Sequence, residues 1–234
     1  MKRIAILGMG RSGTTFITEF LDRCGVFVDD VNWAHEHELA RLVNDTALER
    51  EYGARPGLPY GELPRDEIVL SEGWRRLAQF FVDYMDLRAR ERGRDRWTFK
   101  DPRTTILHSI WLDHFDTIIG MYRAPQEVVA SYTGQGWIKG MGRRRLALNY
   151  WRRFNQSLLR VYEENRSKKM VLMIDYNDDI HRQTTLLCER LGIQITPEAR
   201  SLFQSELKHH SDGKLPSDAE TRTLYDRLLK TKLD

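Results

Sequence analysis

Cysteine is scarce in this sequence, and so are long apolar runs. Cys24 and Cys188 are the only cysteines in 234 residues, which does not indicate the disulfide framework of small secreted proteins. No apolar stretch approaches the roughly 20 residues that span a bilayer. The apolar run at 4–7 ends in a glycine loop before it reaches the length of a signal peptide. We therefore expect a cytoplasmic protein without a membrane span.

A strong excess of one charge is missing as well. Lys and Arg total 37 against 34 for Asp and Glu, a net charge of +3, so no long-range field points to nucleic acid as a partner. Arginines cluster at 143–145 and 152–153, where they form either a solvated helix face or a receptor for a phosphate-rich ligand. With 41% hydrophobic residues, the chain can build one domain, 1–234, around its own core.

Short apolar runs alternate with helical periodicity along the chain. Strands are predicted at 3–8, 97–100, 117–122 and 170–174, and helices at 14–24, 36–51, 72–92, 106–115, 144–165 and 179–191, with one more starting at 125 and a polar helical tail from 197. This alternation predicts an α/β fold with three layers, a parallel sheet flanked by helices on both faces. The segment 53–64, rich in glycine and proline, is a candidate lid.

A glycine-rich loop follows the first predicted strand. In the segment 8–15, GMGRSGTT, small residues let successive backbone N–H groups point at one anion at a helix N-terminus. The loop nearly fits the nucleotide pattern G-x-x-x-x-G-K-[ST], but Thr14 replaces the lysine that pairs with the β and γ phosphates, which argues against ATP. A dinucleotide is disfavoured too, because no strand ending in an acidic residue follows at the required distance. We predict a phosphate cradle, with a plain glycine turn as the alternative.

A second pair of polar residues lies at a later strand end. Arg123 follows an apolar run, and Ser131 comes eight positions later in the next predicted helix. A guanidinium at a strand end and a hydroxyl over the second helical turn can converge on one phosphate. The alternative is a surface arginine and a capping serine without a shared ligand.

Both segments resemble the sulfotransferase family. Its loop for the 5′-phosphosulfate of PAPS (3′-phosphoadenosine 5′-phosphosulfate) has a basic residue before Ser-Gly-Thr-Thr, and its 3′-phosphate site has an arginine followed eight residues on by a serine and an aromatic. The resemblance implies a P-loop NTPase-like sulfotransferase fold, and PAPS as the co-substrate with no metal. The residues implied to hold PAPS are Gly10, Arg11, Ser12, Gly13, Thr14, Thr15, Arg123 and Ser131.

Two weaker similarities, at 100–103 and 173–179, extend the resemblance over most of the chain. A late glycine-rich basic motif is missing from the sequence, so the third anchor of the 3′-phosphate falls to Lys214 or to the arginines at 143–145.

Sulfuryl transfer also needs a base and cations over the leaving phosphate. We expect Arg11 and Lys100 to be the cations, and similarity to bacterial sulfotransferases places the base at Glu36, with His35 in reserve. The alternation of histidine and glutamate at 35–38 is also compatible with a solvated helix start. A metal site is disfavoured because no third ligand follows at a diagnostic spacing. Lys100 has the alternative of a surface lysine at a strand end.

The acceptor is expected to be a hydroxyl or amine of a small molecule, a glycan or a lipid. Four aromatic residues line its pocket or belong to the core: Trp33, Tyr60, Trp74 and Trp137. A P-loop phosphoryl-transfer kinase is the rival enzyme, although it would need a lysine at position 14 and magnesium ligands. A nucleotide-binding sensor that lost the chemistry is the rival from another class.

Overall fold

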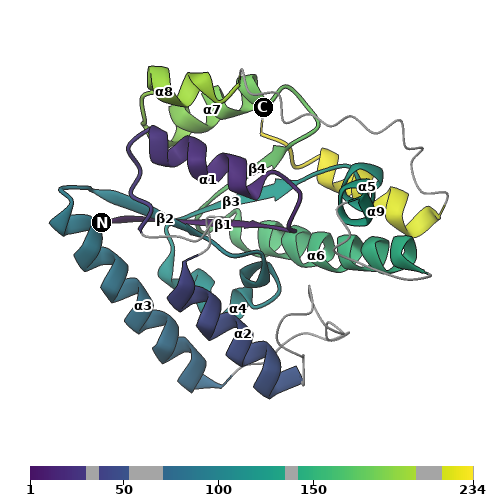
Figure 1. The fold of residues 1–234 in the computed structure, drawn as a ribbon, viewed down its shortest axis with the longest axis horizontal. Helices are drawn as coiled ribbons and strands as arrows, with labels where there is room; N and C mark the ends of the chain where they lie inside the picture. The colour runs from purple at the N-terminus through teal and green to yellow at the C-terminus, as the bar shows by residue number, and fades with distance from the viewer. Residues whose placement is uncertain (30–36, 53–70, 135–141, 204–217, 234) are drawn as a thin grey trace.

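The computed structural model describes residues 1–29, 37–52, 71–134, 142–203 and 218–233, arranged around one sheet (Figure 1). The four strands are β1 (Lys2–Gly8), β2 (Arg96–Lys100), β3 (Thr117–Tyr122) and β4 (Met170–Asp175), in the order β2-β1-β3-β4. Every neighbouring pair is parallel, as in Ile6 beside Lys100. The strands predicted from the apolar runs are therefore confirmed, within one residue at each end.

Helices cover both faces of the sheet, which confirms the predicted three layers (Figure 1). One face carries α1 (Thr14–Arg23), α7 (Ile180–Leu191) and α8 (Pro197–Ser201). The other carries α2 (Glu38–Tyr52), α3 (Glu72–Glu91), α4 (His108–Trp111), α5 (Pro125–Gly134), α6 (Arg143–Asn165) and α9 (Ala219–Leu229). Side chains of β1 alternate between the two layers: Ala5 and Leu7 join the second group of helices, Ile4 and Ile6 the first. Burial on both faces explains why the strands appear as continuous apolar runs.

The prediction of one helix over 106–115 is wrong. The chain instead forms a 3₁₀ turn η1 (Pro102–Thr105), the short helix α4, and a second 3₁₀ turn η2 (Leu112–His114). The apolar residues of this stretch point to more sides than one helical stripe can bury. All are buried in the structure: Ile106, Leu107, Ile110, Trp111, Leu112 and Phe115.

The described parts of the C-terminal tail are mainly helical, as predicted, but α9 also carries buried apolar residues. Leu224 and Leu228 of α9 are buried in the same core as α6, and the Leu233 backbone N–H donates to the Met173 carbonyl oxygen beside β4, at 2.8 Å. Trp74 belongs to the core, because it is buried and its Nε1 donates to Glu51 Oε1 at 2.8 Å. The lid candidate 53–64 lies outside the described residues, as do Trp33, Tyr60, Trp137 and Lys214.

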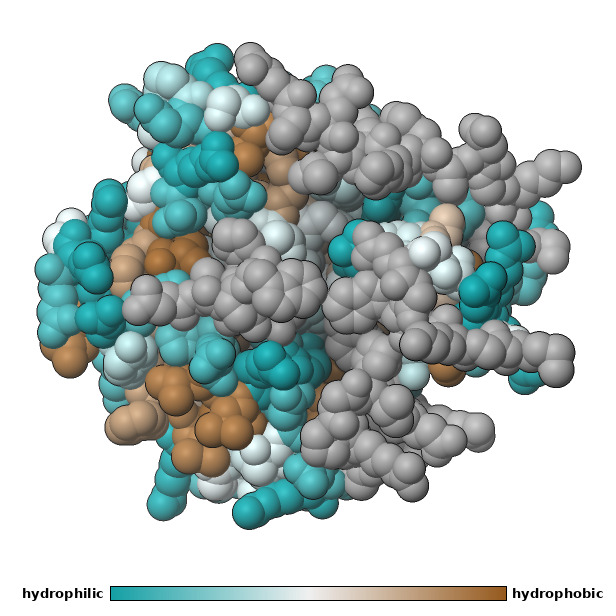
Figure 2. Space-filling model, in the orientation of Figure 1, coloured by the Kyte–Doolittle hydropathy of each residue, from teal (hydrophilic) through white to brown (hydrophobic). Residues whose placement is uncertain are grey.

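Apolar side chains gather on the surface over α2 and α3 (Figure 2). Leu42 is 62% exposed on α2 and Phe80 is 69% exposed on α3. Within the described ranges, no helix has both the length and the apolar content needed to span a bilayer.

Candidate active site

The carboxyl ends of the four parallel strands bring the predicted site segments to one edge of the sheet. The glycine-rich loop follows β1 and turns directly into α1, with Gly13 as the N-cap at φ 87°. Gly8 has φ 143°, and a Cβ there would lie 2.4 Å from the Met121 carbonyl oxygen. Glycine is needed at both positions because an L side chain adopts these backbone angles at a cost and has no room at Gly8.

Arg11 is held toward α5 by an unusual backbone. Its φ of 70° makes it the one non-glycine residue with positive φ among those described. Left-handed backbone costs an ordinary residue about 1–2 kcal/mol. The Nε atom of Arg11 donates to Ser131 Oγ at 2.9 Å, so the loop and the second motif meet although 120 residues separate them.

Ser12 carries a buried hydroxyl whose bonding is incomplete. Its side chain is fully buried, and its Oγ has no hydrogen-bond partner among the described residues. Buried hydroxyls are almost always satisfied in folded proteins, so the Ser12 hydroxyl is an unusual group. Thr14 is also buried, whereas Thr15, in the first turn of α1, is exposed.

Arg123 approaches the same loop from the end of β3. Its Nη1 donates to the Arg11 carbonyl oxygen at 3.5 Å, and its Nη2 pairs with Glu127 Oε2 at 3.1 Å. Burial lowers the pKa of Arg123, Glu127 raises it, and the nearby Arg11 charge lowers it further. An arginine guanidinium is effectively always protonated in proteins, so Arg123 stays charged at neutral pH. Two arginine cations are thus held close enough to repel each other, an arrangement that an anion stabilises.

Tyr176, directly after β4, completes this edge. Its ring packs so closely on the loop that a Cβ on Gly13 would lie 2.2 Å from Cδ2, and the Arg123 guanidinium lies over the ring at 5.5 Å. Burial raises the pKa of Tyr176, while the charges of Arg123 and Arg11 lower it by a smaller amount. Sequence reasoning singled out the segment 173–179 but gave Tyr176 no role. The signal that could have identified Tyr176 from the sequence is its position directly after a predicted strand, at the same edge of the sheet as the glycine loop.

Lys100 ends β2 and is 2% exposed, so it is not the surface lysine of the alternative interpretation. The next residue, Asp101, belongs to a buried polar network around Asn44 of α2. Asn44 Nδ2 donates to Asp101 Oδ2 and to Thr104 Oγ1, both at 3.0 Å, and its Oδ1 accepts from Trp111 Nε1 at 2.8 Å. This network fixes α2 against the end of β2. The sequence alone assigns no role to Asn44.

For several predicted residues, the described part of the chain gives no contact with this site. Glu36 and His35, the candidate bases, lie outside the described residues, although α2 begins two positions after Glu36. Arg143, Arg144 and Arg145 are exposed in the first turn of α6. Arg152 pairs with Asp218 at 2.9 Å and so tethers α9 to α6. In the part of the chain that the structure describes, no group of three His, Cys, Asp or Glu side chains is arranged to hold a metal ion.

Comparison with known proteins identifies the class of protein to which this chain belongs. A model of the sulfotransferase family matches residues 3–197. The chain therefore belongs to the sulfotransferase family.

Two solved structures show what the fold is similar to. The sulfotransferase domain of the Synechococcus PCC 7002 olefin synthase superposes with a TM-score of 0.63 at 18% identity, covering 100% of this chain and 96% of that one. Deoxyadenosine kinase from M. mycoides with bound dATP gives a TM-score of 0.43 at 11% identity, covering 82% and 100%. A comparison with curated proteins finds no match.

Proposed function

We propose that this chain transfers a sulfuryl group from PAPS to a hydroxyl or amine of a small-molecule, glycan or lipid acceptor. Membership of the sulfotransferase family supports the reaction class. One observation supports the donor: Arg11, Arg123 and Ser131 come from two distant motifs and meet at the glycine loop, with Arg11 Nε 2.9 Å from Ser131 Oγ. A donor with phosphates on both its 3′ and 5′ positions needs cations that converge in this way.

The residues present fit such a donor. The backbone N–H groups of Gly10 to Thr15 at the start of α1 suit the 5′-phosphosulfate. The Ser12 N–H is the exception, because it donates to the Met9 carbonyl oxygen at 3.2 Å. Arg123 and Ser131 suit the 3′-phosphate, since both lie where β3 passes into α5. Thr14 is too short to reach a γ-phosphate as a P-loop lysine would.

The chemistry follows from this arrangement. The acceptor oxygen or nitrogen bonds to sulfur while the bond between sulfur and the 5′-phosphate oxygen breaks, and the acceptor proton passes to the base. Arg11 and Lys100 would balance the charge that builds on the departing phosphate. Glu36 remains the proposed base, with His35 in reserve, because α2 is anchored by Asn44 beside the end of β2.

Calorimetric titration tests the donor. We expect the purified chain to bind 3′-phosphoadenosine 5′-phosphate (PAP) about 10- to 100-fold more tightly than ADP or ATP without magnesium, since a hydrogen bond to a charged group contributes about 1.5–3 kcal/mol. Equal or preferred binding of ADP or ATP would favour the kinase instead. Glu36→Gln separates an enzyme from a sensor: we expect unchanged PAP affinity with loss of sulfuryl transfer from PAPS.

A further inference from the structure

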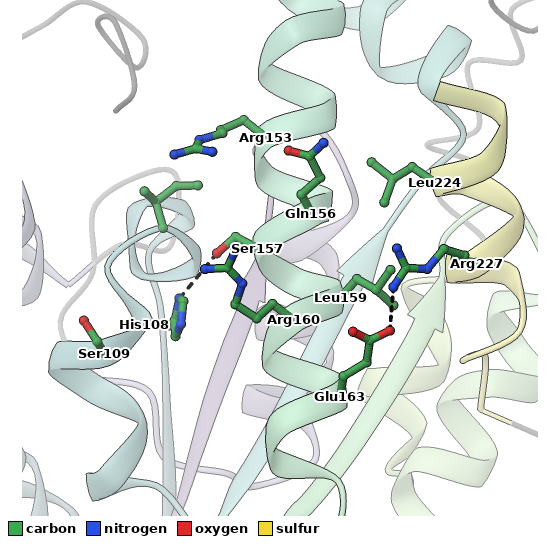
Figure 3. A pocket seen from close by; sticks show the side chains of 11 residues that line it. His108, Ser109, Arg153, Gln156, Ser157, Leu159, Arg160, Glu163, Leu224 and Arg227 are labelled. Atoms are coloured by element: carbon green, nitrogen blue, oxygen red, sulfur yellow. Dashed lines mark hydrogen bonds and ion pairs between the residues drawn. The ribbon is translucent and has the colours of Figure 1, made fainter. Parts of the chain in front are cut away.

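A pocket of about 310 Å³ lies over the outward face of α6, between α4 and α9 (Figure 3). None of the residues placed at the candidate active site belongs to its described lining. The pocket is a concave site on the helical layer that contains α6.

Positive charge dominates the lining. Arg153 and Arg160 are seven positions apart on α6 and so project from one face, toward the side on which His108 lies (Figure 3). Arg227 enters from α9. Glu163 is the one carboxylate among the described lining residues, and it pairs with Arg227 at 2.7 Å. Three arginines against one glutamate give the described lining residues a formal excess of two positive charges.

The rest of the lining combines hydrogen-bonding groups with largely buried leucines. Ser157 Oγ lies 3.3 Å from His108 Nδ1. Leu159 and Leu224 are 3% and 6% exposed and offer a ligand little surface. The arginines therefore dominate recognition, which favours a small molecule that carries a carboxylate, phosphate or sulfate group.

A short hydrogen-bond chain connects the pocket to the glycine loop. Ser157 Oγ donates to the Thr105 carbonyl oxygen at 2.6 Å, and Thr105 Oγ1 accepts from the Gly8 backbone N–H at 2.7 Å. Thr105 is thus a shared hydrogen-bond partner of the pocket and of the first residue of the loop.

We propose that the pocket formed by α4, α6 and α9 binds a small organic anion through Arg153 and Arg160. The test probe is phenyl phosphate, with phenol as its neutral counterpart, and the readout is the imidazole resonance of His108 in protein labelled with ¹³C-histidine. His108→Gln assigns that resonance among the seven histidines. We expect a saturable shift with phenyl phosphate and none with phenol.

The double variant Arg153→Gln/Arg160→Gln should weaken phenyl phosphate binding about tenfold or more, because each guanidinium contributes a charge-assisted contact. Arg190→Gln is the matched control, since Arg190 is exposed on α7 on the opposite face of the sheet. Absence of a His108 shift, or equal affinity in the double variant and wild type, would overturn the proposal.

The binding site itself does not depend on the proposed donor. The titration is run with and without saturating PAP, and without PAP the variant Arg11→Ala removes any contribution from the glycine loop. Failure of PAP to bind would overturn the donor assignment while the His108 titration still decides the pocket.

Adding PAPS and 4-hydroxyphenyl phosphate decides whether the bound anion is the acceptor or an effector. This experiment rests on the proposed function. In this step the phenolic oxygen bonds to sulfur, the sulfur–oxygen bond to the 5′-phosphate breaks, PAP leaves, and the phenolic proton passes to the base. A sulfated product that disappears in the double variant identifies the ligand as the acceptor. Binding without a product supports the pocket as an effector site.

Discussion

Replacing Gly13 with alanine should damage the loop for two separable reasons. At φ 87° an alanine pays about 1–2 kcal/mol for left-handed backbone. Its Cβ would also lie 2.2 Å from Tyr176 Cδ2, and overpacking of this kind costs about 1–3 kcal/mol. We expect the free energy of unfolding to fall by about 2–5 kcal/mol in total, measured by urea denaturation followed by circular dichroism.

Gly142 provides the matched control. It is also a helix N-cap, at φ 85°, and no described atom lies within 4 Å of a Cβ placed there. Gly142→Ala should therefore lose only the backbone part, about 1–2 kcal/mol. In the double variant Gly13→Ala/Tyr176→Ala the steric part should vanish, so that the two substitutions are not additive. Strict additivity, or equal losses for Gly13→Ala and Gly142→Ala, would refute the close packing of Tyr176 on the loop.

Two further predictions concern buried polar groups outside the loop. Asn44→Ala removes one hydrogen bond from each of three buried partners, so the free energy of unfolding measured by urea denaturation should fall by about 3 kcal/mol or more. The control Asn149→Ala, at an exposed position, should lower it little. Similar losses in the two variants would contradict this prediction. Burial by itself raises the pKa of Asp86, but hydrogen bonds from Arg3 and Trp97 and the charge of Arg3 bring it below the ordinary value. The stabilisation from Asp86 should then be complete above about pH 5 and be lost as pH falls through the folded pKa. In Asp86→Asn the free energy of unfolding should fall less steeply below about pH 5 than in the wild type. Parallel curves of unfolding free energy against pH for the two proteins would show that Asp86 is not the cause of the fall.

The sequence was sufficient for the sheet because each strand is buried on both faces and appears as an apolar run between turn signals. It failed at 106–115, where Trp111 and Leu112 are both buried in one core, although on a single helix they would lie on different faces. Periodicity measures one apolar stripe, so a chain that bends to bury several sides looks like a helix.

At the candidate site the spacing within each motif was readable, but the contact between motifs was not. Nothing local indicates that Arg11 Nε reaches Ser131 Oγ across 120 residues, or that Tyr176 covers Gly13. Both contacts depend on the strand order, which puts β3 between β1 and β4 and so places these strand ends beside one another.

The central claim, that Arg123 recognises the 3′-phosphate of the donor, is tested most directly by the ratio of PAP to ADP affinity. Arg123→Ala alone would strand the buried Glu127 carboxylate, so the double variant Arg123→Ala/Glu127→Ala is compared with Glu127→Ala, which keeps the guanidinium. We predict that Glu127→Ala retains the preference for PAP and that the double variant loses it while still binding ADP. A double variant that keeps the full preference would contradict the assignment of Arg123 to the 3′-phosphate.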